Sequence, residues 1–178
     1  AVNYLIRAQV SRLQKSAIKD HITGLFNRRY FDATLDQSLQ KAALKKTSLG
    51  LMLLDVDNFK QYKDRHGHDA GDEVLRGIST FLLGHLRMTD IVCRYGGDEF
   101  AIILSESDEI ALFKTAEKIR EEIKLLKVMY LGVSLEPIAV SLGLAIANKH
   151  GVTRNELVLH ADNSLLAAKQ QGKDRIVM

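Results

Sequence analysis

The feature that most constrains the fold is an almost unbroken apolar run from Leu49 to Val56. Such a run is typical of a strand buried on both faces of a sheet, which requires cover on each side. It ends in Asp55-Val56-Asp57, so acids stand at the carboxyl end of a buried strand, where α/β sheets tend to place their chemistry. The plainer role for Asp55 is to cap the next helix, but Asp57 or Asn58 can fill that role and leave Asp55 available.

A second constraint is a turn that carries two acids. Two short apolar runs, residues 90–93 and 101–104, flank Arg94-Tyr95-Gly96-Gly97-Asp98-Glu99-Phe100 and predict a β-hairpin. We expect the glycine pair to supply backbone angles that other residues resist. Asp98 and Glu99 then lie side by side, and adjacent carboxylates repel unless a cation or a proton relieves them. Mg²⁺ prefers such oxygen ligands. Judged by the turn alone, a hairpin tip exposed to solvent without a ligand is the alternative.

The rest of the chain alternates helical and extended patterns. Apolar periodicity predicts helices over residues 1–19, 28–45, 58–65, 72–85 and 108–127, and a last helix capped by Thr153. A glycine-punctuated loop is expected over 66–72, a strand pair at 128–135 and 138–147 around Glu136-Pro137, and a strand at 175–177. This order favours an α+β fold, an α/β sandwich near the ferredoxin-like or palm plan, with a mixed, mainly antiparallel central sheet flanked by helices.

In such a sheet the end of the 49–56 strand can lie beside the hairpin tip. Asp55, Asp98 and Glu99 would then converge. Three carboxylates can hold one or two Mg²⁺ ions and the triphosphate that the ions bridge. Phosphoryl transfer asks mainly for positioned metals and an in-line nucleophile, so this chemistry is the one that the pattern favours.

Composition narrows the class of protein. The 178 residues make one domain of ordinary size, and the net charge of +3 comes from scattered Lys and Arg, which argues against a nucleic-acid partner. The single cysteine, Cys93, excludes an internal disulfide and reads as a buried small hydrophobe. His66 and His68 are too few ligands to favour zinc. No apolar stretch approaches the ~20 residues that span a bilayer, and we expect no signal peptide.

Residues 1–19 form a separate unit in this interpretation. Their apolar residues alternate at spacings of four and three, as in the seam of a coiled coil, and the chain starts in mid-pattern. We therefore expect a piece of a longer protein, with residues 1–19 as the end of a helical linker or coiled coil and 20–178 as the catalytic domain. An amphipathic helix packed on its own domain is an equal alternative.

The hairpin resembles the signature of the GGDEF family of diguanylate cyclases. The likeness runs from about Asp20 to Met178, in the order and spacing of that family. Further segments that resemble family motifs are 20–29, 55–60, 67–72, 161–162 and 168–173. The resemblance implies that the domain condenses two GTP into cyclic di-GMP and two pyrophosphates, as a homodimer with one GTP per subunit.

The resemblance also implies roles for the acids. Asp55 and Asp98, helped by the Val56 carbonyl, would ligate Mg²⁺, with Mn²⁺ as a possible substitute. Glu99 would ligate the metal or assist deprotonation of the ribose 3′-hydroxyl. Asp72 would accept hydrogen bonds from the guanine edge, which offers N–H donors that adenine lacks at N1.

Basic residues complete the implied site. Backbone amides near Phe59 and Lys60, with the side chains of Lys169 and Lys173, would hold the phosphates. Lys173 stands where the family often has Arg. A lysine keeps the positive charge but loses the bidentate geometry of the arginine guanidinium. Lys63 stands where the family usually has a guanine-contacting Asn, and Lys offers donors only. We expect weaker GTP binding or looser purine choice by roughly 1–2 kcal/mol.

Arg87-Met88-Thr89-Asp90 lies at the spacing of the family's inhibitory product site. By resemblance, Arg87 and Asp90 would bind cyclic di-GMP and slow the enzyme. The alternative is an exposed turn with an incidental charge pair, worth roughly 0–1 kcal/mol.

The main alternative function is a catalytically idle domain that binds GTP or cyclic di-GMP and signals by contact, and Lys63 is the residue that favours it. In either case the resemblance implies an upstream sensor or receiver domain and a domain that faces the cytoplasm. It leaves open whether the full-length protein is anchored in the inner membrane.

Overall fold

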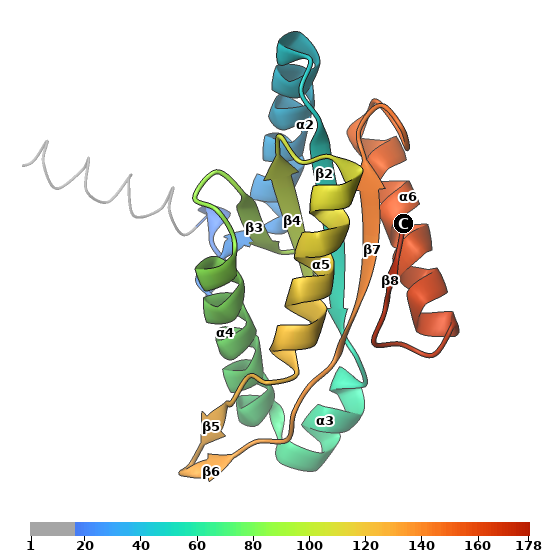
Figure 1. Ribbon diagram of the computed structural model, residues 1–178. Helices are drawn as coiled ribbons and strands as arrows, with labels where there is room; N and C mark the ends of the chain where they lie inside the picture. Colours follow the sequence, from blue (N-terminus) through green and yellow to red (C-terminus); the bar gives the residue numbers. More distant parts are fainter. Residues whose placement is uncertain (1–16) are drawn as a thin grey trace, which may run out of the picture.

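The computed structural model describes residues 17–178, so most of the predicted helix 1–19 lies outside the described residues (Figure 1). A six-stranded sheet has the order β1-β3-β4-β2-β7-β8. Its strands are β1 (Phe26–Asn27), β2 (Leu49–Val56), β3 (Ile91–Arg94), β4 (Glu99–Ser105), β7 (Val140–Ile146) and β8 (Ile176–Val177). Only β1 with β3 and β7 with β8 are parallel pairs. The predicted mixed, mainly antiparallel sheet is confirmed.

Helices cover both faces of this sheet. They are α2 (Arg28–Lys45), α3 (Phe59–His66), α4 (His68–His85), α5 (Glu109–Ile123) and α6 (Arg154–Gln170). One core contains Met52 and Leu54 with apolar residues of α4 and α5, and a second contains Leu51 and Leu53 with residues of α2 and α6. Figure 1 shows these helix pairs on opposite sides of the sheet. Successive residues of β2 thus enter different cores, and all eight are buried, as the sequence predicts.

Two predicted connections are wrong. The loop expected over 66–72 is a single residue, Gly67, whose φ of 89° turns the chain sharply between α3 and α4. The strand pair expected around Glu136-Pro137 does not form. Instead, β5 (Met129–Tyr130) and β6 (Val133–Ser134) make a separate hairpin, closed by two positive-φ residues, Leu131 and Gly132.

The strand β7 has a different partner from the one expected. It pairs with the buried strand β2 on one side and with β8 on the other. Its seven residues are all buried, which places it inside the sheet and away from the β5–β6 hairpin. At its centre, Gly143 lies directly against α6, where an added Cβ would stand 2.1 Å from the Ala161 carbonyl oxygen. Within residues 17–178, no helix combines the length and the apolar character that crossing a bilayer demands.

Candidate active site

The acids of the hairpin and of β2 meet at one end of the sheet. Asp55 is the register partner of Glu99 across the β2–β4 pair, and the Val56 amide donates to the Asp98 carbonyl at 3.2 Å. Asp55 is 6% exposed, whereas Asp98 and Glu99 are half-buried. The structure therefore brings together the ends of β2 and of the hairpin, which carry all three acids.

The two glycines of the hairpin turn differ in their surroundings, and neither has the backbone angles expected of it. Neither Gly96 nor Gly97 adopts a positive φ, so the prediction that both supply unusual angles is wrong. An added Cβ on Gly96 would stand 2.7 Å from Oε2 of Glu99, whereas one on Gly97 would meet no atom of the described chain within 4 Å. A side chain at position 96 would therefore require the flexible Glu99 carboxylate to move, whereas one at position 97 would not.

Arg94 fixes this turn, a role that sequence reasoning missed. Its guanidinium donates to the Gly97 carbonyl from Nε at 3.2 Å and from Nη2 at 2.7 Å. Its Nη1 donates to Asp20 at 3.0 and 3.2 Å, and both side chains are largely buried. Burial opposes ionisation of Asp20, but hydrogen bonds from Thr23 and Arg94 prevail and lower its pKa. Asp20 and Arg94 are 74 residues apart, so no local signal predicts the pair.

The Asp55 carboxyl lies in an unfavourable electrostatic position. The pKa of Asp55 is raised to about 6. Burial is the largest cause, and the negative charges of Asp98 and Glu99 act in the same direction. Lys169 opposes this effect, because its Nζ lies 2.7 Å from Oδ2 of Asp55. A buried carboxyl group beside two further acids gains from a bound cation, because the cation favours its charged form.

The donor set suits a hard divalent ion, since carboxylate and carbonyl oxygens are what Mg²⁺ prefers. Among residues 17–178, however, no three acidic, histidine or cysteine side chains are arranged as a ready-made metal site. Lys169 bonds one of the Asp55 oxygens that a metal would use. Binding of a divalent ion through this oxygen thus requires Lys169 to move.

The turn from β2 into α3 presents backbone N–H groups. Asn58 stands at the N-cap of α3 with a φ of 58°, and within the described chain no side chain caps the helix. Neither Asp57 nor Asn58 fills the capping role expected of it. The Phe59 side chain is core, so only its backbone amide can contact a ligand, whereas the Lys60 side chain is exposed. Uncapped amides at a helix start suit an anion such as a phosphate.

Lys173 comes to this turn from the far end of the chain. Its Nζ lies 2.6 Å from Oδ1 of Asn58. The neighbouring Asp57 accepts from the Ser141 hydroxyl at 2.7 Å and from the Asp174 amide at 2.9 Å. Two lysines, Lys169 and Lys173, therefore lie against the β2 end and the turn that follows it.

Lys63 and Asp72 lie where α3 and α4 meet. The stem of Lys63 covers Gly71, where an added Cβ would stand 2.7 Å from Cγ of Lys63. Nζ of Lys63 lies 5.1 Å from the centroid of the Phe59 ring. Asp72 follows Gly71 on α4 and is half-buried. The lysine that stands in place of the expected Asn thus packs on Gly71, the residue before Asp72.

Arg87 and Asp90 form a turn before β3. Oδ2 of Asp90 accepts from the Arg87 backbone amide at 2.9 Å, and the Arg87 side chain is exposed. Burial raises the pKa of Asp90 despite this bond. Both residues line a cavity of about 400 Å³ that also involves Lys19 and Phe26. Asp90 therefore organises the turn, and the Arg87 guanidinium is not engaged by it.

Comparison with known proteins adds a family match. A family model described as "Diguanylate cyclase, GGDEF domain" matches residues 17–175. The chain is 36% identical over 157 residues to diguanylate cyclase DosC of Escherichia coli, covering 88% of the chain and 34% of that protein. It is 32% identical over 173 residues to the response regulator PleD of Caulobacter vibrioides, covering 97% and 38%. The chain thus spans about a third of the length of these relatives.

Another relative carries a different name. The cyclic di-GMP phosphodiesterase PdeR of Escherichia coli is 34% identical over 167 residues, which covers 94% of the chain and 24% of PdeR. Among solved structures, the coiled coil and GGDEF domain of DgcB from Caulobacter crescentus, in complex with c-di-GMP, has a TM-score of 0.90 and 28% identity. That match covers 98% of this chain and 92% of the DgcB chain.

Proposed function

Because the chain belongs to the family of GGDEF diguanylate cyclase domains, we propose that it condenses two molecules of GTP into cyclic di-GMP and two pyrophosphates. One observation carries the proposal. The buried Asp55 lies opposite Glu99, in contact with Lys169, at the same end of the sheet as the uncapped amides of α3. Acids that need a cation thus lie beside groups that favour phosphate.

In the proposed reaction, the ribose 3′-oxygen of one GTP attacks the α-phosphorus of the other. The new P–O bond forms as the bond to pyrophosphate breaks, and the hydroxyl proton passes to a base. Two such steps close the ring, which requires a homodimer with one GTP on each subunit. Glu99 is the residue we assign to hold the metal or to accept this proton, because it lies on β4 beside Asp55.

Asp55, Asp98, Glu99 and the Val56 carbonyl would hold Mg²⁺, or Mn²⁺ in its place. The bound ion would neutralise charge on the triphosphate and favour loss of the hydroxyl proton. Lys169 would leave Asp55 and bind phosphate, because an ammonium group suits either anion. The α3 amides of Phe59 and Lys60, and the Lys173 side chain, would hold the remaining phosphate oxygens.

Recognition of the base and control of the rate belong to other parts of the surface. Asp72 would accept from the N–H groups of guanine, and Lys63, which packs on the neighbouring Gly71, would supply a donor. Arg87 and Asp90 would bind the product and slow turnover. An upstream sensor or receiver domain would set the dimer arrangement, and a domain that uses GTP would lie in the cytoplasm.

A second candidate function is a domain that binds GTP or cyclic di-GMP without turnover. The observations that favour it are Lys63 in place of the expected Asn and the Lys169–Asp55 ion pair, which occupies a metal-ligand oxygen. The relative PdeR, which is named a cyclic di-GMP phosphodiesterase, also shows that a similar sequence occurs in a protein that is not named as a cyclase.

Turnover tests the two candidates against each other. A leucine-zipper fusion at the N-terminus enforces the dimer, and GTP with Mg²⁺ is followed by chromatography of the nucleotides. We expect cyclic di-GMP from the parent and from Asp69→Ala, an exposed acid on α4, and none from Asp98→Ala. A dimer, verified by light scattering, that makes no product refutes the cyclase proposal. Binding of cyclic di-GMP by that inactive dimer would support the second candidate.

A further inference from the structure

The loop that carries Lys173 has a conformation that its own sequence does not favour. Gly172, Lys173 and Asp174 have φ values of 115°, 64° and 43°. Glycine adopts such angles readily, and Asp tolerates them, but a lysine rarely does. Consecutive residues in this region persist only where the surroundings over-determine them. Contacts outside the loop must therefore hold it.

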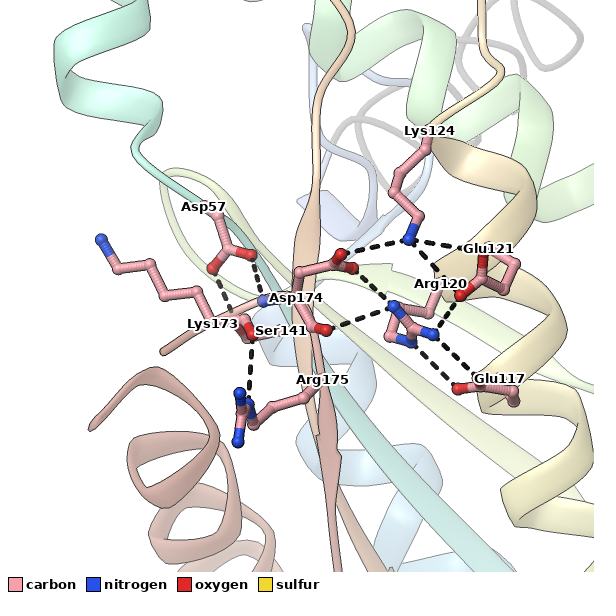
Figure 2. Close-up of polar contacts among 9 residues, drawn as sticks. All are labelled: Asp57, Glu117, Arg120, Glu121, Lys124, Ser141, Lys173, Asp174 and Arg175. Carbon is pink, nitrogen blue, oxygen red and sulfur yellow. Dashed lines mark hydrogen bonds and ion pairs between the residues drawn. The ribbon is translucent and has the colours of Figure 1, made fainter. Parts of the chain in front are cut away.

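These contacts converge on Asp174 from two sides. Nη1 of Arg120, on α5, donates to Oδ1 of Asp174 at 2.8 Å and to its carbonyl oxygen at 3.2 Å. Nζ of Lys124, one turn later, lies 3.1 Å from Oδ2 of Asp174. On the other side, the Asp174 amide donates to Asp57 at 2.9 Å. Figure 2 shows Arg120 and Asp57 on opposite sides of Asp174.

Arg120 is itself held rigidly. Its Nε and Nη2 donate to the two carboxylate oxygens of Glu117 at 2.9 and 2.8 Å, and its side chain is only 13% exposed. Nη2 also contacts Glu121. A planar guanidinium fork fixed on one edge by Glu117 presents its other edge to Asp174 in one orientation, which a lysine cannot do.

We propose that Arg120 is a positioning residue for phosphate binding, which holds the 171–175 loop through Asp174 and thereby places the Lys173 ammonium group at the β2–α3 turn. The proposal rests on the proposed function for its ligand, a nucleoside triphosphate. Within residues 17–178, Arg120 forms no hydrogen bond with Lys173 or Asn58, so its effect passes through Asp174. The network ties α5, the end of β2 and the last loop into one unit, and it includes neither Asp72 nor Lys63, the residues assigned to the base.

A pair of arginine variants tests this. Arg120→Lys keeps the charge and loses the fork. Arg76→Lys is the matched control, because Arg76 on α4 bonds Glu73 three residues earlier, as Arg120 bonds Glu117. The ligands are 3′-deoxy-GTP, which lacks the attacking hydroxyl, and GMP, both with Mg²⁺ in calorimetry. We expect Arg120→Lys to weaken 3′-deoxy-GTP binding about tenfold and GMP binding less than about twofold, with Arg76→Lys close to the parent for both.

A double-substitution cycle shows whether Lys173 carries the effect. In a Lys173→Ala background, we expect Arg120→Lys to change 3′-deoxy-GTP affinity by less than about twofold. A tenfold loss that persists in this background overturns the positioning role. The positioning role is also overturned if Arg120→Lys binds 3′-deoxy-GTP as tightly as the parent and has the parent's circular dichroism spectrum. A parent that binds no 3′-deoxy-GTP counts instead against the proposed function.

Hydrogen exchange without nucleotide gives a readout that is independent of the ligand. The Asp174 amide, bonded to Asp57, should exchange faster in Arg120→Lys and at the parent's rate in Arg76→Lys. Equal exchange in all three proteins overturns the inference, whatever the nucleotide affinities are.

Discussion

Replacing Asp55 by Asn should stabilise the metal-free protein at neutral pH while it removes the proposed cyclase activity. The buried carboxyl has its pKa raised from 3.8 to about 6, primarily by burial and further by Asp98 and Glu99. Ionising it in the folded protein therefore costs free energy that the unfolded chain does not bear. Asn has nearly the same shape and carries no charge, so the substitution removes this cost.

The magnitude follows from the size of the shift. About two pH units at about 1.4 kcal/mol each give an upper value of about 3 kcal/mol at pH 7.5. Between pH 3.8 and about 6 the folded protein binds more protons at Asp55 than the unfolded chain, so parent stability falls as pH rises through this window. The advantage of Asp55→Asn should thus be about 3 kcal/mol at pH 7.5 and below about 1 kcal/mol near pH 4.

Urea unfolding in EDTA at pH 7.5 and pH 4 measures both values. Asp64→Asn, an exposed acid on α3, is the control and should stay within about 0.5 kcal/mol of the parent. A variant that is no more stable than the parent at pH 7.5, or one whose advantage is the same at both pH values, refutes the reasoning. Saturating Mg²⁺ should narrow the difference, because the ion would stabilise only the parent's carboxylate.

Other predictions concern single positions. Lys63→Asn should lower KM for GTP by roughly 5- to 30-fold, as for one restored hydrogen bond, and an unchanged KM would show that the position carries no guanine contact. Arg87→Ala should weaken inhibition by cyclic di-GMP at least about tenfold with unchanged initial rates, since the bond from Arg87 to Asp90 comes from the backbone amide, which the substitution keeps; equal inhibition in parent and variant would assign the turn a purely structural role. Gly143→Ala should cost about 3 kcal/mol in urea unfolding, because its Cβ would overlap the Ala161 carbonyl, whereas Gly97→Ala should cost less than about 0.5 kcal/mol; similar costs for both would contradict the packing argument.

The elements that were predicted correctly are those whose signal is local. The run at Leu49–Val56 and the two flanks of the hairpin are short and apolar. Each of these runs forms one strand, so its position can be found from the sequence. Their antiparallel pairing then brings Asp55 opposite Glu99. The helix cap at Thr153 was also predicted correctly, because a cap depends on residues within one turn.

What the sequence did not reveal depends on contacts between distant segments. Arg94 bonds Asp20, 74 residues away, and Arg120 bonds Asp174, 54 residues away. Neither pair produces a local or periodic pattern in the sequence. The close approach of the Glu99 carboxylate to Gly96 depends on how that side chain folds back, which no turn rule contains. The abrupt junction at Gly67 was missed because several glycines and histidines together suggested a longer loop.

The bond network of Arg94 also sets a rule for protein engineering. One guanidinium holds both Asp20, where the chain leads into the sheet, and the carbonyl of the signature turn. The β1 strand that follows Asp20 pairs with β3, which carries Arg94. A chimaera that receives a new regulatory segment should therefore be spliced before Asp20, because a junction after it would discard the anchor that keeps the turn in place.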